Sequence, residues 1–577
     1  MFPLAADSVA WSASGDTSPP TQPGAIATSG LTANSVTLAW GASKDNVAIE
    51  GYRVYRGPAG AAAGALTLIA TADAVTSYSA THLYSGRGYT FGIVAIDAAN
   101  NQSPMRTVQV STPGSSDSTP PAAPSSASVR VSVFSSSRID VLWGASSSSD
   151  VAGYQVLRDG AVVGRMDLPG GLHYSDNGLA AKSTHSYAVR AVDSAGNLSA
   201  ATTARSATTS AAGTAAIARG PLLSNVTATS AVVSWWTNIP TTGRIGYGVG
   251  STGSNTATDP QGSVLHHMVK LSGLAPGTTY QYAVTSAAST GSSATRSASF
   301  STAAPAGRTF SFAAIGDFGG ASSGEQQNAT AIAAAGTSFI QTLGDNVYPS
   351  SGFIDPNFAT TYSDVDARFF KQFGTAVMSQ PLLPMNGNKE RYSDGQFWQD
   401  FPMLGANHAW YSYDWGNAHI TVMDSEEPVD PASPQYAFLQ QDLAAHASST
   451  WRIVTVHKPP HSSTSANSSY KLGQQYLVPL FDQYHVQLVL SGNSHNYERS
   501  RQLKGGAVVS SGGTTYVVSG GGGSGFNAFR ISQPSWSAFR EATFFEFTKV
   551  TVSPTSLLVQ GIRADTRAVF DSVTITG

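Results

Sequence analysis

Short runs of alternating apolar and polar residues, separated by turn-forming residues, fill positions 17–303 of the chain. Alternation with a period of two places every second side chain on the same face, which is the pattern of a half-buried β-strand. Strands joined by turns about every ten residues are typical of β-sandwiches of about 100 residues. We therefore expect β-sandwiches and few helices in this part of the chain.

Two stretches of this region repeat the same order of features. Each begins with a proline-rich linker, continues with a strand that ends in a tryptophan (Trp40 and Trp143), and contains a later strand that begins with a tyrosine (Tyr89 and Tyr187). A sandwich of this size needs large buried anchors. We therefore assign the four aromatic side chains to core packing and not to ligand binding.

The repeated units resemble fibronectin type III domains, over residues 17–113 and 118–209. A third, less similar sandwich is expected at 217–303. It leads into the next region without a long proline-rich linker. We therefore expect the third sandwich to dock on the region that follows it.

The pattern changes after Arg308. Apolar runs of strand length at 310–315 and 339–343 each end on Gly-Asp, and the alanine-rich segment 325–336 between them has the composition of a helix. Strand, helix and strand in this order predict an α/β unit. Ligands of such units gather at the carboxyl ends of the strands.

Three later strands repeat this design. They are expected at 384–386, 451–456 and 486–491, and they lead to Asn388, His457 and Asn493. A single strand that ends on Gly-Asp means little, but five strand ends with Gly-Asp, Gly-Asn or His are hard to obtain by accident. Two carboxylates that adjacent strands bring to one sheet edge can share a hard metal ion.

Residues 309–577 resemble the calcineurin-like metallophosphoesterases, and specifically the purple acid phosphatase branch. Besides the strand ends, the resemblance rests on a Gly-Asp-x-x-Tyr motif that ends at Tyr348, on segment 410–419 and on the glycine-rich segment 516–523. The sandwich at 217–303 resembles the N-terminal domain of that branch. The resemblance implies an α/β domain with two facing sheets and outer helices, which hydrolyses phosphate esters as an acid phosphatase or a phosphodiesterase.

The resemblance also implies which residues hold two metal ions. Two carboxylates, a phenolate and an imidazole would hold the first metal, ferric iron: Asp317, Asp345, Tyr348 and His495. Asp345 would bridge to the second metal, zinc, manganese or ferrous iron, which Asn388 and His457 would also bind. These donors suit such ions, and two metals about 3.5–4 Å apart could polarise a phosphoryl oxygen and supply a hydroxide for in-line attack.

Two positions depart from the pattern of the family. The family has Gly-Asn-His-Glu where this chain has Lys389, and Gly-His-x-His where it has Asn493. An amide oxygen binds a transition metal more weakly than an imidazole does, so we expect a weakly held second metal. Asn493 is either a weak ligand or an amide beside the ligands. Lys389 adds a positive charge with three donors, which could bind phosphate or partly replace the second cation.

Two other histidines of this region also call for an interpretation. His461 shares a loop with His457, and it is a candidate for proton transfer or phosphate binding. His419 is expected to pack in the fold.

The residues leave two classes of function open. The first-metal set and His457 favour a phosphomonoesterase or phosphodiesterase. Lys389 and Asn493 favour a catalytically weakened pseudoenzyme or surface-binding module carried on fibronectin-like domains. A variant engineered from an active parent is a third interpretation. Metal analysis combined with an aryl phosphate assay would separate the first two.

Composition limits the partners. The net charge is −3 and lysine and arginine are scattered singly, so no nucleic-acid-binding patch is expected. The chain has no cysteine, which excludes disulfides and thiolate ligands and fits a bacterial exported protein.

No apolar run is long enough for a membrane span. The opening segment is too short and too poor in charge to be a signal peptide, so we expect a secreted protein whose signal peptide has been removed. Its fibronectin-like domains would contact polysaccharide or a surface.

Overall fold

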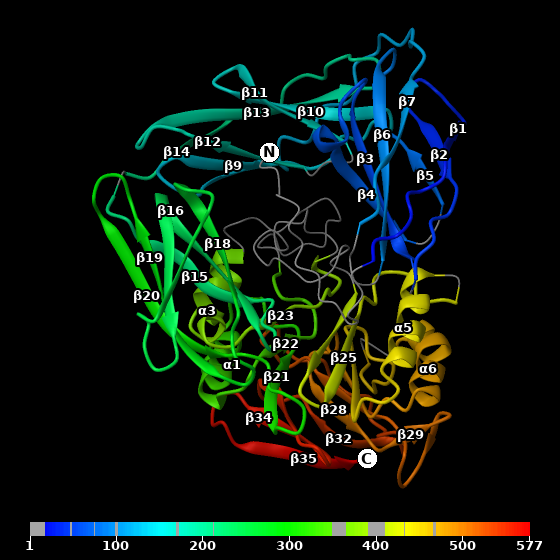
Figure 1. Cartoon of the computed structure of the whole chain (residues 1–577), viewed down its shortest axis with the longest axis vertical. Coiled ribbons are helices and arrows are strands. Elements are labelled where there is room, and N and C mark those ends of the chain that lie inside the picture. The colour runs from blue at the N-terminus through cyan, green and yellow to red at the C-terminus, as the bar shows by residue number, and fades with distance from the viewer. Residues whose placement is uncertain are drawn as a thin grey trace. The chain divides into compact units, whose positions relative to one another are not determined.

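The computed structural model describes residues 18–46, 49–73, 76–97, 102–168, 172–211, 213–348, 365–390, 410–431, 433–465 and 469–577. The opening residues, on which the signal-peptide interpretation rests, lie outside these ranges. By its contacts the chain divides into two compact units, and the boundary between them lies at Ala211 and Ala212. Figure 1 labels the elements of both units.

The first unit begins with two sheets around one core. One sheet has the order β1 (Ile26–Ser29), β2 (Val36–Trp40), β5 (Ser77–Ala80), and the other has the order β4 (Thr67–Asp73), β3 (Ile49–Pro58), β6 (Gly88–Asp97), β7 (Arg106–Ser111). Trp40 and Tyr89 are buried in the core that these sheets share. Their assignment to core packing is confirmed.

Two more sheets of the first unit share a second core. Their orders are β12 (His173–Asn177), β9 (Arg138–Leu142), β8 (Arg130–Val133) and β11 (Ala161–Asp167), β10 (Val151–Arg158), β13 (Thr184–Asp193), β14 (Arg205–Thr208). Trp143 and Tyr187 are buried here, as expected. Among the described residues of the first unit the only helix is the short η1 (Ala63–Ala65).

The second unit opens with a six-stranded sheet that folds over on one long strand. Its strands are β15 (Ile217–Ser224), β16 (Ser230–Gly248), β17 (Asn255–Thr258), β18 (Val264–Ser272), β19 (Thr279–Ala287) and β20 (Ser293–Ser301). The first half of β16 pairs with β15 and β18, and its second half pairs with β17 and β19. One strand therefore joins both halves of this part.

Hydrogen bonds dock these strands on the α/β region that follows. The buried guanidinium of Arg219 donates to Asp366 Oδ1 at 2.7 Å. The hydroxyl of Tyr282 donates to the carbonyl oxygen of Met378 at 2.7 Å. Asp366 begins the π-helix η2 (Asp366–Phe370), and Met378 ends the 3-10 helix η3 (Ala376–Met378). These strands are thus attached to the α/β region by hydrogen bonds from two buried side chains.

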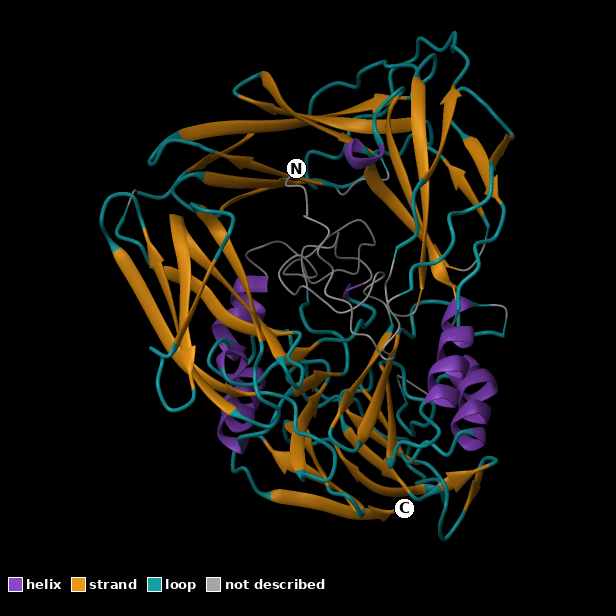
Figure 2. Ribbon diagram, viewed as in Figure 1, coloured by secondary structure: helices purple, strands orange, loops and turns teal. Residues whose placement is uncertain are grey.

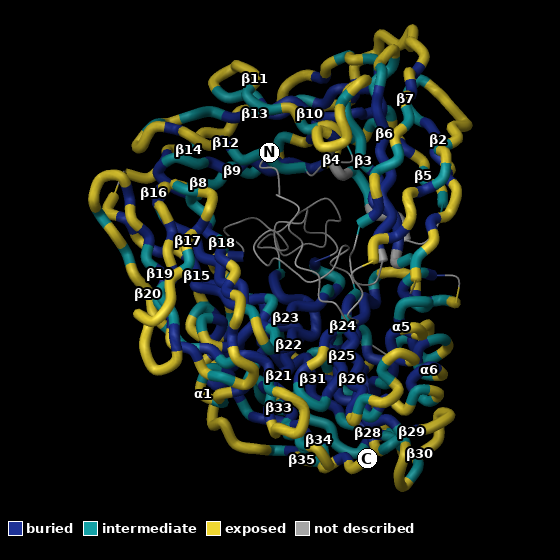
Figure 3. The backbone as a smooth tube through the Cα atoms, viewed as in Figure 1, coloured by how far each residue is buried: buried dark blue, intermediate teal, exposed yellow. Residues whose placement is uncertain are grey.

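The α/β region contains two large sheets. The first has the order β23 (Leu382–Leu383), β22 (Ile340–Thr342), β21 (Phe310–Ile315), β33 (Glu546–Val552), β34 (Ser556–Arg563), β35 (Val569–Thr576). The second has the order β24 (Tyr411–Trp415), β25 (Ala418–Met423), β26 (Trp451–Val456), β27 (Leu488–Ser491), β31 (Thr515–Ser519), β28 (Tyr497–Ser500), β32 (Ser537–Glu541). A small hairpin joins β29 (Leu503–Lys504) and β30 (Ala507–Val508). The central strands of both sheets are buried (Figure 3).

The expected elements of this region are largely present. The strands at 310–315 and 451–456 have the expected bounds as β21 and β26. The strand expected at 384–386 is wrong: β23 lies at Leu382–Leu383, before Pro384. Proline has no backbone N–H to donate to a sheet, so the strand ends ahead of it.

Helices flank the strands in two groups (Figure 2). One group contains α1 (Ser323–Ala335) and α3 (Lys371–Phe373), and the other contains α5 (Pro434–Ala445), η5 (Gly473–Leu477) and α6 (Val478–Gln483). A capping box fixes the start of α1, because Ser322 Oγ accepts from the Glu325 backbone N–H and the Glu325 carboxylate accepts from the Ala321 N–H. None of the described helices is long and apolar enough to cross a membrane.

A largely buried ion pair links the two large sheets. Arg499 on β28 donates to both carboxylate oxygens of Asp571 on β35, at 2.5 and 2.8 Å, and the Tyr497 hydroxyl donates to the same carboxylate at 2.9 Å. Three charge-assisted hydrogen bonds in a site with little water hold the sheets together.

We expect Asp571→Ala to lower the free energy of unfolding by about 3 kcal/mol, because it leaves the Arg499 guanidinium without its buried partner. Asp565→Ala is the matched control, since the Arg563–Asp565 pair is exposed and such pairs contribute little. Urea unfolding of both variants measures the difference. Equal losses of stability in the two variants would contradict this role of Asp571.

Candidate metal centre

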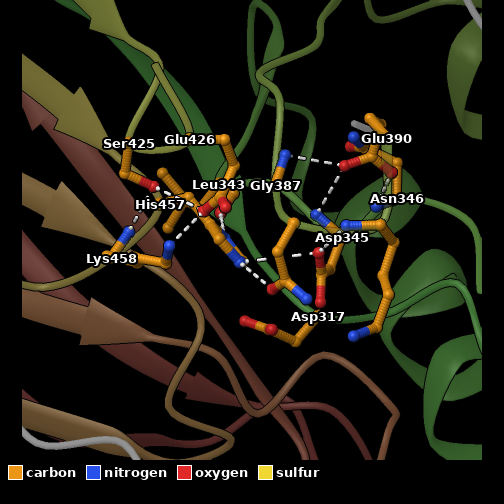
Figure 4. A network of polar contacts seen from close by, with 12 residues as sticks. Asp317, Leu343, Asp345, Asn346, Gly387, Glu390, Ser425, Glu426, His457 and Lys458 are labelled. Carbon is orange, nitrogen blue, oxygen red and sulfur yellow. Dashed lines mark hydrogen bonds and ion pairs between the residues drawn. The ribbon is translucent and has the colours of Figure 1, made fainter. Parts of the chain in front are cut away.

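Strand ends from both large sheets meet at one place. Asp317 follows β21 and Asp345 follows β22, and these two strands are parallel neighbours. In the other sheet His457 follows β26 and His495 lies shortly after β27, which are also parallel neighbours. The carboxyl ends of parallel strands lie at one edge of a sheet, so each sheet delivers its polar side chains together. Figure 4 shows Asp317, Asp345 and His457 pointing toward one another.

The four side chains expected to hold the first metal include a tight group of three. The Tyr348 hydroxyl lies 3.4 Å from Asp317 Oδ1 and 3.4 Å from His495 Nε2. His495 Nε2 in turn lies 3.5 Å from Asp317 Oδ1. A phenol, an imidazole and a carboxylate therefore present their donor atoms to one point.

The fourth side chain, Asp345, lies beside the residues expected at the second metal. Asp345 Oδ1 lies 3.5 Å from His457 Nε2, which is 3.2 Å from Asn388 Oδ1. The other ring nitrogen, His457 Nδ1, lies 2.7 Å from the Leu343 carbonyl oxygen and donates to it. This hydrogen bond fixes the tautomer that leaves the lone pair of Nε2 directed at Asp345.

The donor atoms fit a cation. One ligand atom each from Asp317, Asp345 and His457 lie within 4.8 Å of one another. Asp317 Oδ2 is buried and has no hydrogen-bond partner in the described part of the chain. A buried carboxylate oxygen without a partner is costly, and a metal ion would satisfy it. The residues present thus suit the metal that the sequence pattern implies.

Glycines let the backbone approach these side chains. A Cβ added at Gly492 would lie 2.7 Å from Asp317 Oδ2. One added at Gly344, where φ is +85°, would lie 2.5 Å from His457 Nδ1. Both distances are too short for a real side chain, so only glycine permits the cluster at these positions.

Comparison with known families identifies three parts of the chain. The chain matches three family descriptions: "Purple acid Phosphatase, N-terminal domain" over residues 221–302, "Iron/zinc purple acid phosphatase-like protein C" over residues 513–572 and "Fibronectin type III domain" over residues 18–111. A nucleotide pyrophosphatase/phosphodiesterase from Hordeum vulgare is 31% identical over 259 residues, which cover 38% of this chain and 70% of that protein. The chain belongs to the purple acid phosphatase family.

Other relatives of this member of the purple acid phosphatase family match over smaller shares of their own length. Chitinase A1 from Niallia circulans is 39% identical over 201 residues, or 34% of this chain and 27% of that protein. A probable inactive purple acid phosphatase 27 from Arabidopsis thaliana is 26% identical over 260 residues, or 38% of this chain and 42% of that protein. The chain thus spans less than half the length of these two relatives.

The fold is similar to a solved purple acid phosphatase, isolated from yellow lupin (Lupinus luteus) seeds. The TM-score is 0.55 at 17% sequence identity, and the match covers 76% of this chain and 93% of that one. At this identity the likeness concerns the fold alone. Together with the family matches, it confirms the expected resemblance to purple acid phosphatases and fibronectin type III domains.

Three residues of the site have a strained backbone conformation. Asp317, Asp345 and Asn493 have φ values of +58°, +54° and +60°, in the left-handed region that side chains other than glycine seldom adopt. Each such residue costs about 1 kcal/mol or more, which the surrounding structure must offset. Asparagine adopts this region more readily than most residues, so conformation alone gives a reason for an asparagine at 493.

Glu390 organises the loops of the site, although the sequence motifs assign no role to it. Its buried carboxylate accepts hydrogen bonds from the backbone N–H groups of Asp345 at 3.0 Å, Asn346 at 2.7 Å and Gly387 at 2.7 Å (Figure 4). Burial and the nearby Asp345 charge raise the pKa of Glu390 to about 7. The signal in the sequence for this role is an acidic residue directly after Lys389, in a loop that also contains candidate metal ligands.

Lys389 faces the cluster. Its backbone N–H donates to Asp345 Oδ1 at 2.9 Å, and its Nζ lies 5.5 Å from the centre of the Tyr348 ring. Its positive charge acts to lower the pKa of both Asp345 and His495. The ammonium therefore lies close to the residues expected at the first metal. The sequence alone left the position of this ammonium open.

His461 packs in surroundings that do not favour proton transfer or phosphate binding. Its ring contacts the aromatic rings of Tyr516 and Trp536, with centroid distances of 4.6 and 5.5 Å. Burial lowers the pKa of His461 to about 4, so the ring is neutral at neutral pH. This environment favours packing over proton transfer. His419 is buried between Asp414 and Asp442, as expected for a residue that packs in the fold.

Protons compete with a metal for the site. Burial disfavours the charged imidazoles, but the carboxylates of Asp317 and Asp345 outweigh it and raise the pKa of both His457 and His495. Burial also raises the pKa of Asp345. Without a cation, these groups hold their protons to higher pH than isolated side chains do.

We expect metal binding to weaken as the pH falls, because a cation binds only the neutral imidazoles and the ionised carboxylates. The raised histidine pKa values place this loss at higher pH than for free imidazole. Metal content after dialysis in steps from about pH 8 down to about pH 4 measures it. A metal content that stays constant over this range would contradict the assigned ligands.

Proposed function

We propose that the chain hydrolyses phosphate esters at a metal centre between the two large sheets. The observation that carries the proposal is the convergence of two carboxylates, a phenol and two imidazoles from the segments that follow four strands. Asp317 Oδ2, which has no hydrogen-bond partner among the described residues, lies in this cluster. Membership of the purple acid phosphatase family supports the same activity. When bound, the metals would supply Lewis acidity and an activated water.

The ligands divide into two sets. Ferric iron would be held by Asp317, Asp345, Tyr348 and His495. Zinc, manganese or ferrous iron would be held by the second set: Asp345, Asn388, His457 and Asn493. The second set has a single imidazole, whereas amide oxygens bind such ions weakly. The second metal is therefore the weaker one in this proposal.

The chain's own residues supply the rest of the site. The Lys389 ammonium, which lies beside Tyr348, would bind a phosphate oxygen of the substrate. The hydrogen bond from His457 Nδ1 to the Leu343 carbonyl holds that imidazole in place. His461 receives no catalytic step in this proposal, because its ring packs against Tyr516 and Trp536.

Metal-loaded protein is expected to release para-nitrophenol from aryl phosphates, and Asp345→Asn is expected to lose turnover by about 100-fold or more, since a neutral amide replaces the bridging carboxylate. Tyr348→Phe is expected to remove the visible absorption band of an iron-loaded sample. Asp565→Asn, an exposed carboxylate far along the chain, is the control. Absence of turnover in fully metal-loaded, folded protein would contradict the proposal.

Unequal metal occupancy is expected in protein as purified. The first set has two carboxylates, a phenolate and an imidazole, whereas the second has an asparagine where the family pattern has an imidazole. Elemental analysis after dialysis should find one tightly held metal and a substoichiometric second one. Asn493→His should raise retention of the second metal. Two fully retained metals in the untreated protein would contradict this division.

A catalytically weakened binding module is the second candidate function. The substitutions at Lys389 and Asn493 favour it, and one relative carries the name of a probable inactive purple acid phosphatase. The activity assay above decides between the two candidates.

We further propose that the chain is a secreted bacterial protein whose fibronectin-like domains contact polysaccharide or another surface. The similarity to a chitinase and to an exoglucanase from Cellulomonas fimi supports this. A chain that begins near residue 215, after the first unit, should keep its fold and its turnover of small substrates but lose retention on insoluble chitin or cellulose. Equal retention of both chains would contradict the assigned role of the front domains.

A further inference from the structure

A second group of potential metal ligands lies at one edge strand of the second large sheet. Asp414 on β24 and His419 on β25 are register partners in an antiparallel pair, so their side chains lie on the same face. His446 caps the C-terminus of α5, and its ring is stacked on that of His419 with the centroids 3.5 Å apart. One ligand atom each from Asp414, His419 and His446 lie within 4.8 Å of one another. Three segments thus bring two imidazoles and a carboxylate together.

This cluster is separate from the candidate metal centre. The strands β25 and β26 are parallel, and His457 of the centre follows the carboxyl end of β26. His419, in contrast, is the second residue of β25 and lies at the amino end of that strand. Substrates of α/β domains bind at the carboxyl ends of the strands. The cluster therefore lies at the opposite edge of the sheet and is not part of the proposed catalytic site.

Hydrogen bonds orient both imidazoles. His446 Nδ1 lies 2.8 Å from the carbonyl oxygen of Asp442 and donates to it, because a carbonyl oxygen can only accept. The other nitrogen, His446 Nε2, lies 4.0 Å from Asp414 Oδ2. His419 Nε2 donates to Asp442 Oδ2 at 2.9 Å, and its Nδ1 lies 2.8 Å from Asp414 Oδ1. Histidines that bind metals almost always donate their other ring N–H to a carboxylate or a backbone carbonyl, and Asp442 supplies both acceptors.

The orienting residue is itself held in place. Asp442 is buried, and its carboxylate accepts from Ser412 Oγ at 2.7 Å and from Thr421 Oγ1 at 2.6 Å. The side chain of Asp414, on the other side of the imidazoles, is 56% exposed. The cluster therefore has a fixed buried side and a side that is open to an ion from solvent.

The distances between the donor atoms are compatible with a tetrahedral zinc ion. With bonds of about 2.0–2.1 Å to zinc, neighbouring ligand atoms lie about 3.4 Å apart. The Asp414 carboxylate lies 2.8 Å from His419 Nδ1 and 4.0 Å from His446 Nε2. A small shift of this exposed carboxylate and a slight turn of the His446 ring would equalise the two distances. Imidazole and carboxylate ligands suit zinc, and water would complete its coordination.

A proton competes with the metal at this place. Burial disfavours the charged form of His419, but hydrogen bonds to Asp414 and Asp442 outweigh this and raise the pKa of His419 to about 9. A metal must displace this proton, which weakens binding at neutral pH. Arg452, which donates to the carbonyl oxygen of Ala447 at 2.7 Å, adds positive charge near the end of α5. We therefore expect a site that loses zinc on dialysis and fills when zinc is added.

We propose that Asp414, His419 and His446 form a peripheral zinc site, which ties the C-terminus of α5 to the hairpin of β24 and β25. The ligands come from three segments that only the folded chain brings together, so bound zinc would stabilise the fold. The inference does not depend on the proposed phosphoesterase function. An ion pair of His419 with the two carboxylates, without any metal, is the other outcome of the tests.

Zinc content after equilibrium dialysis of the full chain against added zinc is the first test. His446→Gln and Asp414→Asn should each hold one zinc ion fewer per chain than the unsubstituted protein, because each removes a ligand. Both side chains are at least partly exposed, so both variants should fold. His485→Asn is the matched control, since it removes an exposed imidazole and asparagine tolerates the φ of +53° at that position. Equal zinc contents in all these proteins would overturn the inference.

The same dialysis in an Asp345→Asn background separates this site from the candidate metal centre. Asp345→Asn weakens zinc binding at that centre, but the difference of one zinc ion between chains with and without His446→Gln should persist. Loss of the difference would place the zinc ion at the candidate metal centre and overturn the inference.

Urea unfolding with and without zinc tests the role of the ion. Added zinc should raise the unfolding midpoint of the unsubstituted protein and of His485→Asn more than that of His446→Gln, because only the first two retain all three ligands. Equal shifts of the midpoint in the three proteins would overturn the inference.

Discussion

Two buried carboxylates, Asp317 and Asp345, lie at the ends of neighbouring parallel strands, and the cost of keeping both charges out of water governs the arrangement around them. Burial raises the pKa of Asp345, and the charge of Asp317 raises it further. Two imidazoles and the ammonium of Lys389 offset part of this cost. Asp317 Oδ2 has no hydrogen-bond partner among the described residues, and a bound cation would offset the cost of burying it.

The backbone adopts strained conformations in this arrangement, and the sheets stabilise them. Asp317 and Asp345 both have positive φ values, which a flexible loop would relax. The strands paired with β21 and β22, and the Glu390 carboxylate that accepts from several N–H groups, oppose this relaxation. Stability of the whole α/β region is thus coupled to the geometry of a few strained residues.

The same electrostatic balance gives the two departures from the family pattern a common meaning. An asparagine at 493 would offer a second cation a weaker ligand than an imidazole, whereas the ammonium of Lys389 lies beside Tyr348 of the first set. Both substitutions change the charge or the donor atoms that an anion would meet at this site.

Local elements and the order of the candidate ligands could be predicted from the amino-acid sequence alone. Largely apolar runs predicted β21 and β26, an alanine-rich segment predicted α1, and the Gly-Asp and His residues after the strands predicted a metal centre, because these signals depend on neighbouring residues. The tertiary structure was needed to show that Glu390 organises the loops, that Lys389 faces the cluster and that His461 packs against Tyr516 and Trp536. These facts depend on contacts between segments far apart in the chain, such as His457 with Leu343, and a local pattern carries no information about which distant side chains will share a face or compete for the same charge.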